Sequence, residues 1–396
     1  MFKKFLDITP KFTYAPEYDI KPEAEWYGVK ALMYEGAEFQ GKKTRVFAYI
    51  GYPDGIKEGE KVPAMVLVHG GGGHAYADWI KRWNAHGFAA IAMDLRGYIS
   101  KDELKGLTGT EKVGDDEYKR MPETDELGAM PDDYSVYREN GKTSDLWLYQ
   151  SIANVIFAHN ILRADSKIDS SKIGITGISW GGVITSQVIA HDPRFAFAAP
   201  IYGSGHLNLS ISWMQNHFGG KNQSRLWCVA DKYPKINFPV LWTCWNMDGA
   251  FDIFPNSISY LQTKQNGGIL AILNNTNHSH QHGWAMDEPY LFAKSVVCGG
   301  KKLIHPVTEP HGFSDISFEI SDSSETVEAK IFYLTSPMEY TEESKPNYEW
   351  KTAPCTVCGK TVSAKIPGEA NNYYVEITEN YEGKIYTTTT AYITNL

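Results

Sequence analysis

Residues 172–182 read KIGITGISWGG, and this stretch decides the fold. Residues 172–176 have the β-branched composition of a short buried strand, and residues 182–190 (GVITSQVIA) have that of a helix. Between them, residues 177–181 (GISWG) form a G-x-S-x-G motif in the strand–turn–helix context that a nucleophile elbow requires. Small neighbours leave room for the strained backbone that would hold Ser179 Oγ clear of the strand. We therefore predict a nucleophilic serine; the alternative is a glycine-rich turn without chemistry.

Apolar runs of strand length alternate with helical patterns on both sides of this stretch. The alternation predicts a doubly wound, mostly parallel α/β sheet. Two antiparallel strands are expected before it, over 27–35 and 44–52, and residues 1–25 are interpreted as a strap over the surface. The parallel strands are predicted at 62–69, 88–94, 172–176, 195–200, 239–245 and 269–273, and the helices at 79–86, 146–164, 182–190 and 289–298.

The chain has 396 residues, which is long for one hydrophobic core, so we expect a large domain and a smaller one. Residues 299–302 (GGKK) are the expected linker between a catalytic domain over 1–300 and a second domain over 301–396. The second part alternates apolar and polar residues between turn residues, which predicts a small antiparallel β-sandwich of the immunoglobulin or fibronectin III kind. Its strands are expected at 313–320, 327–334, 362–366, 373–377 and 384–393.

Residues 99–143 interrupt the alternation of strands and helices. They are charged, rich in Gly and Pro, and weakly patterned. A long loop of this kind is uncommon inside a compact domain unless it is functional. Two interpretations stay open: an insertion that passes near the mouth of the active site, or a plain surface loop.

A serine nucleophile on such a sheet is followed along the chain by an acid and then by a histidine. The apolar strand at 239–245 leads to Asp248, which we predict to be the acid that orients the histidine and stabilises its charged form. Asp252 lies in the same loop and is the alternative acid. The alternative to a catalytic role is, for either aspartate, that it caps a turn or lies solvated in the loop.

The predicted base follows the last strand of the sheet, where residues 276–282 read TNHSHQH. His278 is nearest the strand end and is the favoured general base, because an unperturbed histidine pKa of about 6.5 suits proton transfer near neutrality. His280 and His282 are the alternatives. Three clustered histidines are also typical of a metal-binding tract, but the order of serine, acid and histidine favours catalysis.

A glycine loop is expected to supply part of an oxyanion hole. Residues 69–73 (HGGGG) follow the strand at 62–69, and glycines let backbone N–H groups approach a developing negative charge. We predict that Gly71 supplies one donor, with Gly72 as the alternative, and that Trp180, the residue after the nucleophile, supplies the other. A phosphate-binding loop is disfavoured because the G-K-[ST] of a P-loop is missing.

Composition limits the classes of partner. The net charge of −9 argues against nucleic acid and anionic membranes as partners. No apolar run predicts a transmembrane helix, and the first twelve residues lack the apolar core of a signal peptide. Five sparse cysteines fit a reducing cytoplasm, and the single C-x-x-C at 355–358 is interpreted as two strand or turn thiols, since zinc would need four ligands. We expect no metal and no cofactor, and leave a homo-oligomer open.

The motifs together resemble one branch of the α/β-hydrolase superfamily, the acetyl xylan esterase-like and dienelactone hydrolase- or dipeptidyl-peptidase-like proteins. The resemblance covers about residues 25–300, and some relatives carry a similar C-terminal β-sandwich. It implies an α/β-hydrolase fold and transfers the roles above to Ser179, Trp180, Gly71, Asp248 and His278. One departure is Trp245, which stands three residues before the acid where relatives commonly have glycine, and this keeps Asp252 open. The motifs that carry the resemblance are VLVHGGGG, AMDLRG, DLWLYQSIANVIFAHNILR, IGITGISWGG, DPRF, PVLW…D and NHSHQHGW.

The expected activity is a serine esterase that hydrolyses short-chain acyl esters through an acyl-enzyme. The resemblance implies acetyl groups on carbohydrate, and Tyr76, Trp245 and Trp284 are predicted to offer a flat face to a sugar or aryl substrate. A serine peptidase of the prolyl-oligopeptidase or dipeptidyl-peptidase type is one alternative, although about 60 residues before the first parallel strand are too few for a propeller domain. A carboxylesterase for other substrates and a non-catalytic sugar-binding protein are further alternatives.

Overall fold

A computed structural model describes residues 1–20, 27–100, 118–120, 134–343 and 345–395. The chain forms two compact units: the first comprises residues 1–203 and 279–284, and the second comprises residues 204–278 and 285–396. No helix in the described ranges is both long and apolar enough to cross a bilayer.

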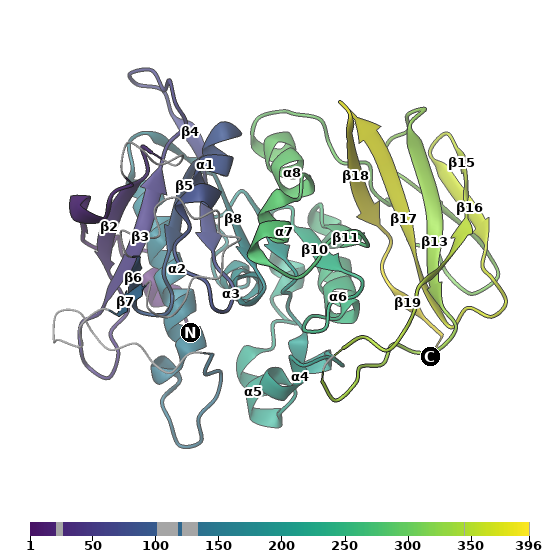
Figure 1. Ribbon diagram of the computed structural model, residues 1–396, viewed down its shortest axis with the longest axis horizontal. Helices are drawn as coiled ribbons and strands as arrows, with labels where there is room; N and C mark the ends of the chain where they lie inside the picture. The colour runs from purple at the N-terminus through teal and green to yellow at the C-terminus, as the bar shows by residue number, and fades with distance from the viewer. Residues whose placement is uncertain (21–26, 101–117, 121–133, 344, 396) are drawn as a thin grey trace. The chain divides into compact units, whose positions relative to one another are not determined.

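The first unit is built on a sheet whose strands lie in the order β1-β2-β3-β5-β4-β8-β9. Figure 1 labels β2, β3, β4, β5 and β8 of this sheet. The first three strands and β5 pair antiparallel, whereas β5, β4, β8 and β9 run parallel. The mostly parallel α/β sheet expected from the sequence is therefore confirmed. The strands are β1 (Phe12–Tyr14), β2 (Lys30–Glu35), β3 (Arg45–Gly51), β4 (Val62–Val68), β5 (Ala89–Met93), β8 (Ile168–Ile178) and β9 (Phe197–Ile201).

Three helices pack on this sheet: α1 (Ala77–Ala85), α2 (Trp147–Ala164) and α3 (Trp180–Ile189). α2 is buried along nearly its whole length, which explains why apolar residues occur all around the helix rather than on one face. Several of its polar side chains make hydrogen bonds to other elements, and Oδ1 of Asn154 accepts the Ala37 N–H at 2.9 Å. α2 thus packs against the strands β4, β5 and β8, and β8 leads directly to Ser179.

The N-terminal segment differs from the expected surface strap. β1 pairs with β2 at the edge of the sheet, and Phe2 and Phe5 are buried against the ring of Tyr149. The reason is hydrophobic: two phenylalanines within five residues gain more from burial than from lying on the surface. Residues 21–25 lie outside the described residues.

Most of the predicted insertion over 99–143 lies outside the described residues. Within the described part, β6 (Tyr98–Ser100) pairs antiparallel with β7 (Tyr118–Arg120). Residues 134–143 are also described and bring Tyr134 to the glycine loop, as detailed below.

The second unit contains two strands that pair parallel, β10 (Leu241–Trp245) and β11 (Ile269–Leu273). The helices α4 (Gln215–Phe218), α5 (Lys221–Trp227), α6 (Ile253–Thr263) and α8 (Glu288–Val297) belong to the same unit. The short helix α7 (His280–Ala285) begins within the histidine-rich stretch 276–282, and its residues 280–284 belong to the first unit. The sequence patterns did not predict α4, α5, α6 or α7.

The C-terminal part of the second unit is an antiparallel β domain, as expected. One sheet has the order β12-β16-β15, and the other has the order β14-β13-β17-β18, with β19 beside β17. Both sheets contribute to a shared core that contains Phe318, Ile331, Val362 and Tyr373. The boundary at 300/301 stays a prediction. The strands are β12 (Asp315–Glu319), β13 (Val327–Leu334), β14 (Lys351–Pro354), β15 (Thr356–Cys358), β16 (Thr361–Lys365), β17 (Asn372–Tyr381), β18 (Lys384–Thr389) and β19 (Ile393–Thr394).

Candidate active site

Ser179 occupies a strained turn between β8 and α3. Its backbone angles are φ 60° and ψ −122°, a conformation that costs a non-glycine residue about 1–3 kcal/mol. Two hydrogen bonds hold the turn: the Ser179 N–H donates to the carbonyl of Ile201 at 3.0 Å, and the Ser179 carbonyl accepts from the N–H of Val183 at 3.0 Å. The geometry is that of a nucleophile elbow.

The glycines of the G-x-S-x-G motif are required by close backbone approach. A Cβ atom on Gly177 would lie 2.2 Å from the carbonyl oxygen of Gly181, and one on Gly181 would lie 2.0 Å from the carbonyl oxygen of Val68. Backbone atoms cannot move aside as a flexible side chain could. The motif therefore lets α3 start directly over the end of β4.

Three N–H groups of the glycine loop donate to partners that shape it. Gly70 N–H donates to Nε2 of His280 at 2.8 Å, and Gly72 N–H donates to the hydroxyl of Tyr134 at 2.7 Å. Gly73 N–H donates back to the carbonyl of Gly70 at 3.1 Å. The loop is thus held at both ends.

Gly71 lies beside Trp180, as the predicted pair of oxyanion donors requires. A Cβ on Gly71 would lie 2.9 Å from Cδ1 of Trp180. Within the described ranges, no hydrogen bond is found for the Gly71 N–H. The alternative, Gly72, already donates to Tyr134, so the loop favours Gly71.

His69 fixes the start of the loop. Its Nδ1 donates to the Gly70 carbonyl at 2.7 Å, and its Nε2 accepts the N–H of Leu95 at 2.9 Å. Burial lowers the pKa of His69 to about 3, so the ring is neutral and both hydrogen bonds persist near neutral pH. Sequence reasoning treated this histidine only as part of the loop motif.

The second unit pairs Asp248 with His278. Nδ1 of His278 lies 2.7 Å from Oδ2 of Asp248, whose side chain is fully buried. The other carboxylate oxygen accepts the N–H groups of Ala250 at 2.8 Å and Phe251 at 3.0 Å. The His278 ring also stacks on Phe251, with ring centroids 5.6 Å apart. The aspartate therefore fixes the orientation of the imidazole, and Nε2 points away from this bond.

Asp252 has a structural role. It is the N-cap of α6, where its Oδ1 accepts the N–H of Phe254 at 3.3 Å. Its Oδ2 accepts the N–H of Ile211 at 3.0 Å and the hydroxyl of Ser210. Burial raises the pKa of the Asp252 carboxyl above its usual value. These contacts favour Asp248 as the acid.

The other two histidines of the cluster have different partners from His278. Nε2 of His280 accepts the Gly70 N–H, as described above, and Nδ1 of His282 lies 2.7 Å from the hydroxyl of Ser279. Among the described residues, no three His, Cys, Asp or Glu side chains are grouped closely enough to hold a metal ion. Cys355 and Cys358 are free thiols.

The aromatic residues predicted to bind substrate lie in different surroundings. Tyr76 and Trp284 are buried and pack edge to face, with centroids 5.1 Å apart, and Tyr76 also contacts the ring of His280. Trp245 is half-buried at the end of β10. Their role in substrate binding stays a prediction.

Tyr134 is a residue of the candidate site that sequence reasoning missed. Its ring stacks on Trp180 with centroids 5.3 Å apart and packs against Trp147. It comes from the unpatterned stretch 99–143, in which no sequence signal distinguishes it. Ser179, Gly71 and Trp180 belong to the first unit and the Asp248–His278 pair to the second, so the complete triad stays a prediction.

Residues 13–204 match the model of the acetyl xylan esterase family (AXE1). This range contains the glycine loop and Ser179, and it ends before Asp248 and His278. The resemblance expected from the motifs is confirmed over the matched range, and with it the expectation of a carboxylic ester hydrolase.

Two solved structures and one further protein are also similar to this chain. An acetyl xylan esterase from Paenibacillus sp. R4 is 16% identical with a TM-score of 0.49, over 74% of this chain and 92% of that one. An acylaminoacyl peptidase from Pyrococcus horikoshii is 17% identical with a TM-score of 0.45, over 74% of this chain and 41% of that one. A probable dipeptidyl-peptidase 5 from Aspergillus clavatus is 33% identical over 78 residues, which are 19% of this chain and 10% of that protein.

Proposed function

We propose that the protein is a serine esterase that hydrolyses short-chain acyl esters, in particular acetyl esters on carbohydrate such as xylo-oligosaccharides. The observation that carries the proposal is the strained turn at Ser179, which lies inside the range that matches the acetyl xylan esterase family. A backbone held at positive φ in a non-glycine residue is typical of a functional position.

In the proposed reaction, Ser179 Oγ attacks the ester carbonyl carbon while Nε2 of His278 takes its proton. The tetrahedral intermediate collapses, the C–O bond to the alcohol breaks, and the histidine returns the proton to the leaving alkoxide. Water then attacks the acyl-enzyme with the same assistance and releases the acid. The hydrogen bond from His278 to Asp248 supports this role, because it leaves Nε2 as the basic nitrogen.

The N–H groups of Gly71 and Trp180 are the proposed donors to the negative oxygen of the intermediate. Their proximity supports the assignment, and the contacts of the neighbouring glycines hold the loop in one shape. A preorganised donor of this kind contributes about 3–4 kcal/mol to catalysis. The stack of Tyr134 on Trp180 would keep the second donor in place.

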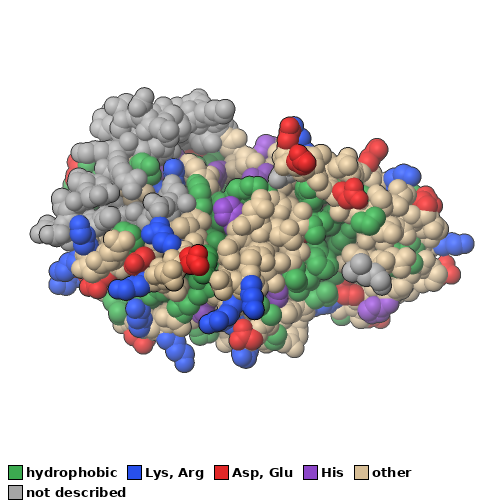
Figure 2. Space-filling view, turned by 90° about the horizontal axis from the view of Figure 1, so that it is seen from below, with side chains coloured by type: hydrophobic (Ala, Val, Ile, Leu, Met, Phe, Trp, Pro, Cys, Tyr) green, Lys and Arg blue, Asp and Glu red, His purple; other side chains and the backbone are tan. Residues whose placement is uncertain are grey.

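The proposed partner is a small-molecule or oligosaccharide ester. The net charge of −9 argues against nucleic acid, and on the face drawn in Figure 2 basic and acidic side chains lie interspersed. A cytoplasmic location is part of the proposal, and the sparse, free cysteines support it. Tyr76, Trp245 and Trp284 remain the proposed aromatic contacts with substrate.

A serine peptidase is the second candidate. The 33% identity over 78 residues with a probable dipeptidyl-peptidase 5 favours it, and the same acyl-enzyme chemistry would cleave an amide. The two candidates differ in the leaving group, so substrates distinguish them.

The test is a substrate panel for the purified protein and its Ser179→Ala variant. It comprises p-nitrophenyl acetate, p-nitrophenyl butyrate, acetylated xylo-oligosaccharides and dipeptidyl p-nitroanilides. We expect acetate release from the sugars by the wild type and none by the variant. Hydrolysis of aryl esters alone would refute the carbohydrate assignment, and faster cleavage of the anilides than of the esters would establish the peptidase.

A further inference from the structure

Residues 246–252, between β10 and α6, form the loop that carries Asp248, here called the acid loop. Three aromatic side chains of the C-terminal β domain donate hydrogen bonds to its backbone. The hydroxyl of Tyr340 donates to the carbonyl of Asp248 at 3.1 Å. The carbonyl of Asn246 accepts two bonds, from the Tyr348 hydroxyl at 3.1 Å and from the Trp350 Nε1–H at 3.0 Å. These donors come from one stretch, residues 340–350, about a hundred residues after the loop. Residues distant in the sequence therefore contribute to holding the acid loop.

The side chain of Asn246 is held by β17. Its Nδ2 donates to the hydroxyl of Tyr374 at 3.1 Å, and both residues are buried. The Tyr374 ring stacks on Phe332 and lies edge to face with Trp350, with both centroid separations at 5.1 Å. The donors and the ring packing form one aromatic cluster: Phe332, Tyr340, Tyr348, Trp350 and Tyr374.

β17 also contacts the histidine loop, which is the segment 274–279 between β11 and α7 that carries His278. Glu376, two residues after Tyr374 and so on the same face of β17, accepts a hydrogen bond from the side chain of Asn274. Asn274 follows β11 directly and precedes His278 by four residues. One face of β17 thus contacts both loops that carry the Asp248–His278 pair.

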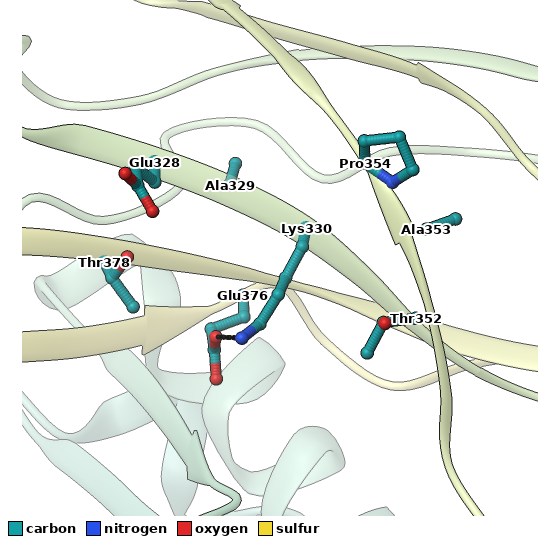
Figure 3. A pocket seen from close by; sticks show the side chains of 8 residues that line it. All are labelled: Glu328, Ala329, Lys330, Thr352, Ala353, Pro354, Glu376 and Thr378. Carbon is teal, nitrogen blue, oxygen red and sulfur yellow. Dashed lines mark ion pairs between the residues drawn. The ribbon is translucent and has the colours of Figure 1, made fainter.

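Glu376 is itself held by Lys330 of β13. Lys330 Nζ lies 3.1 Å from Oε1 of Glu376, and Figure 3 shows this ion pair in an open pocket on the β domain. Burial raises the pKa of Glu376, and the Lys330 ammonium opposes this shift. The lysine therefore helps to keep the carboxylate charged as an acceptor for Asn274.

The tyrosine donors do not titrate near neutral pH. Burial raises the pKa of both Tyr340 and Tyr348 well above the usual value for tyrosine. Both hydroxyls therefore keep their protons, and Tyr340 and Tyr348 lie 3.2 Å apart, oxygen to oxygen. Their hydrogen bonds to the acid loop therefore do not depend on pH near neutrality.

We propose that the C-terminal β domain is a positioning device for the catalytic acid and base, acting through the aromatic cluster on the acid loop and through Glu376 on the histidine loop. Tyr340, Tyr348, Trp350 and Glu376 are positioning residues, since they contact the loops and not the reacting atoms. The inference rests on the proposed function of Asp248 and His278. A displacement of about 1 Å in such a pair is enough to cost a large factor in kcat.

The first experiment compares Tyr340→Phe, Tyr348→Phe and their double variant with the wild type on p-nitrophenyl acetate. Phenylalanine keeps the ring packing and removes only the hydroxyl donor. We expect kcat to fall by about tenfold in the double variant while KM stays within about twofold, because the acyl pocket is untouched. Circular dichroism and the unfolding temperature report on the fold of each variant.

The matched control is Tyr333→Phe, which removes a tyrosine hydroxyl of the same domain. The Tyr333 hydroxyl donates to Glu369 at 3.0 Å and contacts neither loop, so kcat should not change. A double variant that unfolds earlier than the wild type but retains the wild-type kcat would overturn the proposal, because it would show a purely structural role.

A second pair of variants tests the histidine loop. Glu376→Ala removes the acceptor for Asn274, whereas Glu376→Gln keeps one acceptor oxygen. We expect kcat to fall in the alanine variant and to be largely restored in the glutamine variant, with KM unchanged in both. Equal kcat in all three proteins would refute this arm.

The outcome that refutes the proposed function is different. A wild-type protein that hydrolyses no ester, and whose Ser179 does not react with a fluorophosphonate, would refute the serine esterase itself. An active, labelled wild type with unaffected cluster variants would refute only the positioning role.

Discussion

Nδ1 of His278 lies 2.7 Å from Oδ2 of Asp248, and the second oxygen of this carboxylate is bonded to two backbone N–H groups. Backbone groups of its own loop therefore hold the Asp248 carboxylate in place, and the carboxylate in turn orients the imidazole of His278. Four residues along the chain, Asp252 uses both oxygens to cap α6 and to hold residues 210–211. Two aspartates of one loop thus have separable roles, which mutagenesis can distinguish.

Asp248→Asn should lower kcat for p-nitrophenyl acetate by about 10³-fold or more, because the amide no longer stabilises the imidazolium or favours the required tautomer. Asp252→Asn should retain most of the activity and lower the unfolding temperature, because the helix cap is weakened. Steady-state kinetics and thermal unfolding of both variants check this. The reverse pattern would make Asp252 the acid.

His278→Ala should abolish ester hydrolysis, because His278 is the proposed acceptor of the serine proton. His282→Ala is the matched control, since His282 is exposed and bonds only the nearby Ser279 among the contacts described. Its kcat/KM should stay within about threefold of the wild type. Strong loss of activity in the His282 variant together with an active His278 variant would reassign the base.

Gly181→Ala should destabilise the protein by about 1–3 kcal/mol or prevent folding, because the new methyl group would overlap the Val68 carbonyl. Gly368→Ala is the control, since a Cβ there meets no atom within 4 Å. Urea unfolding of both variants gives the comparison. Equal stability would mean that the elbow is less crowded than described.

Glu288 makes stability depend on pH. Burial raises its pKa from 4.5 to about 7, and its carboxylate accepts the Thr387 N–H at 3.0 Å. Between these two values the folded state binds more protons than the unfolded state, so the free energy of unfolding falls as pH rises through this window. The contribution is fully present below about pH 4.5 and is lost above about pH 7.

Glu288→Gln mimics the protonated side chain at every pH. At pH 8 the variant should be more stable than the wild type by about 1–3 kcal/mol, and at pH 4 the two should be nearly equal. Denaturant unfolding at both pH values measures the difference. A variant that is less stable at pH 8 would show that the charged form is the stabilising one.

The core of the fold was predictable because buried parallel strands are apolar runs between turn residues. The residues at which the strands and helices begin and end were harder to predict. β8 begins at Ile168, before the expected Lys172, because pairing of Ile168 with Val62 extends the strand through polar residues. α6 was not predicted; it contains Pro255 in its first turn, where a proline interrupts no hydrogen bond of the helix.

The candidate catalytic residues were easier to predict from the sequence than the residues that hold their loops in place. Ser179, Asp248 and His278 follow strand ends in a recognisable order, so local patterns are enough to propose them as the triad. Tyr134 and Tyr340 lie in stretches without periodicity, and only the folded path brings them to the glycine loop and the acid loop. Long-range hydrogen bonds of this kind leave no trace in local composition.

The most direct test of the account is the ratio of kcat/KM for p-nitrophenyl acetate between the wild type and Ser179→Ala. If Ser179 is the nucleophile, we expect a loss of about 10³-fold or more in a variant that unfolds at the wild-type temperature. A folded Ser179→Ala variant that retains activity within about tenfold of the wild type would contradict it, because the acyl group could then not pass through Ser179.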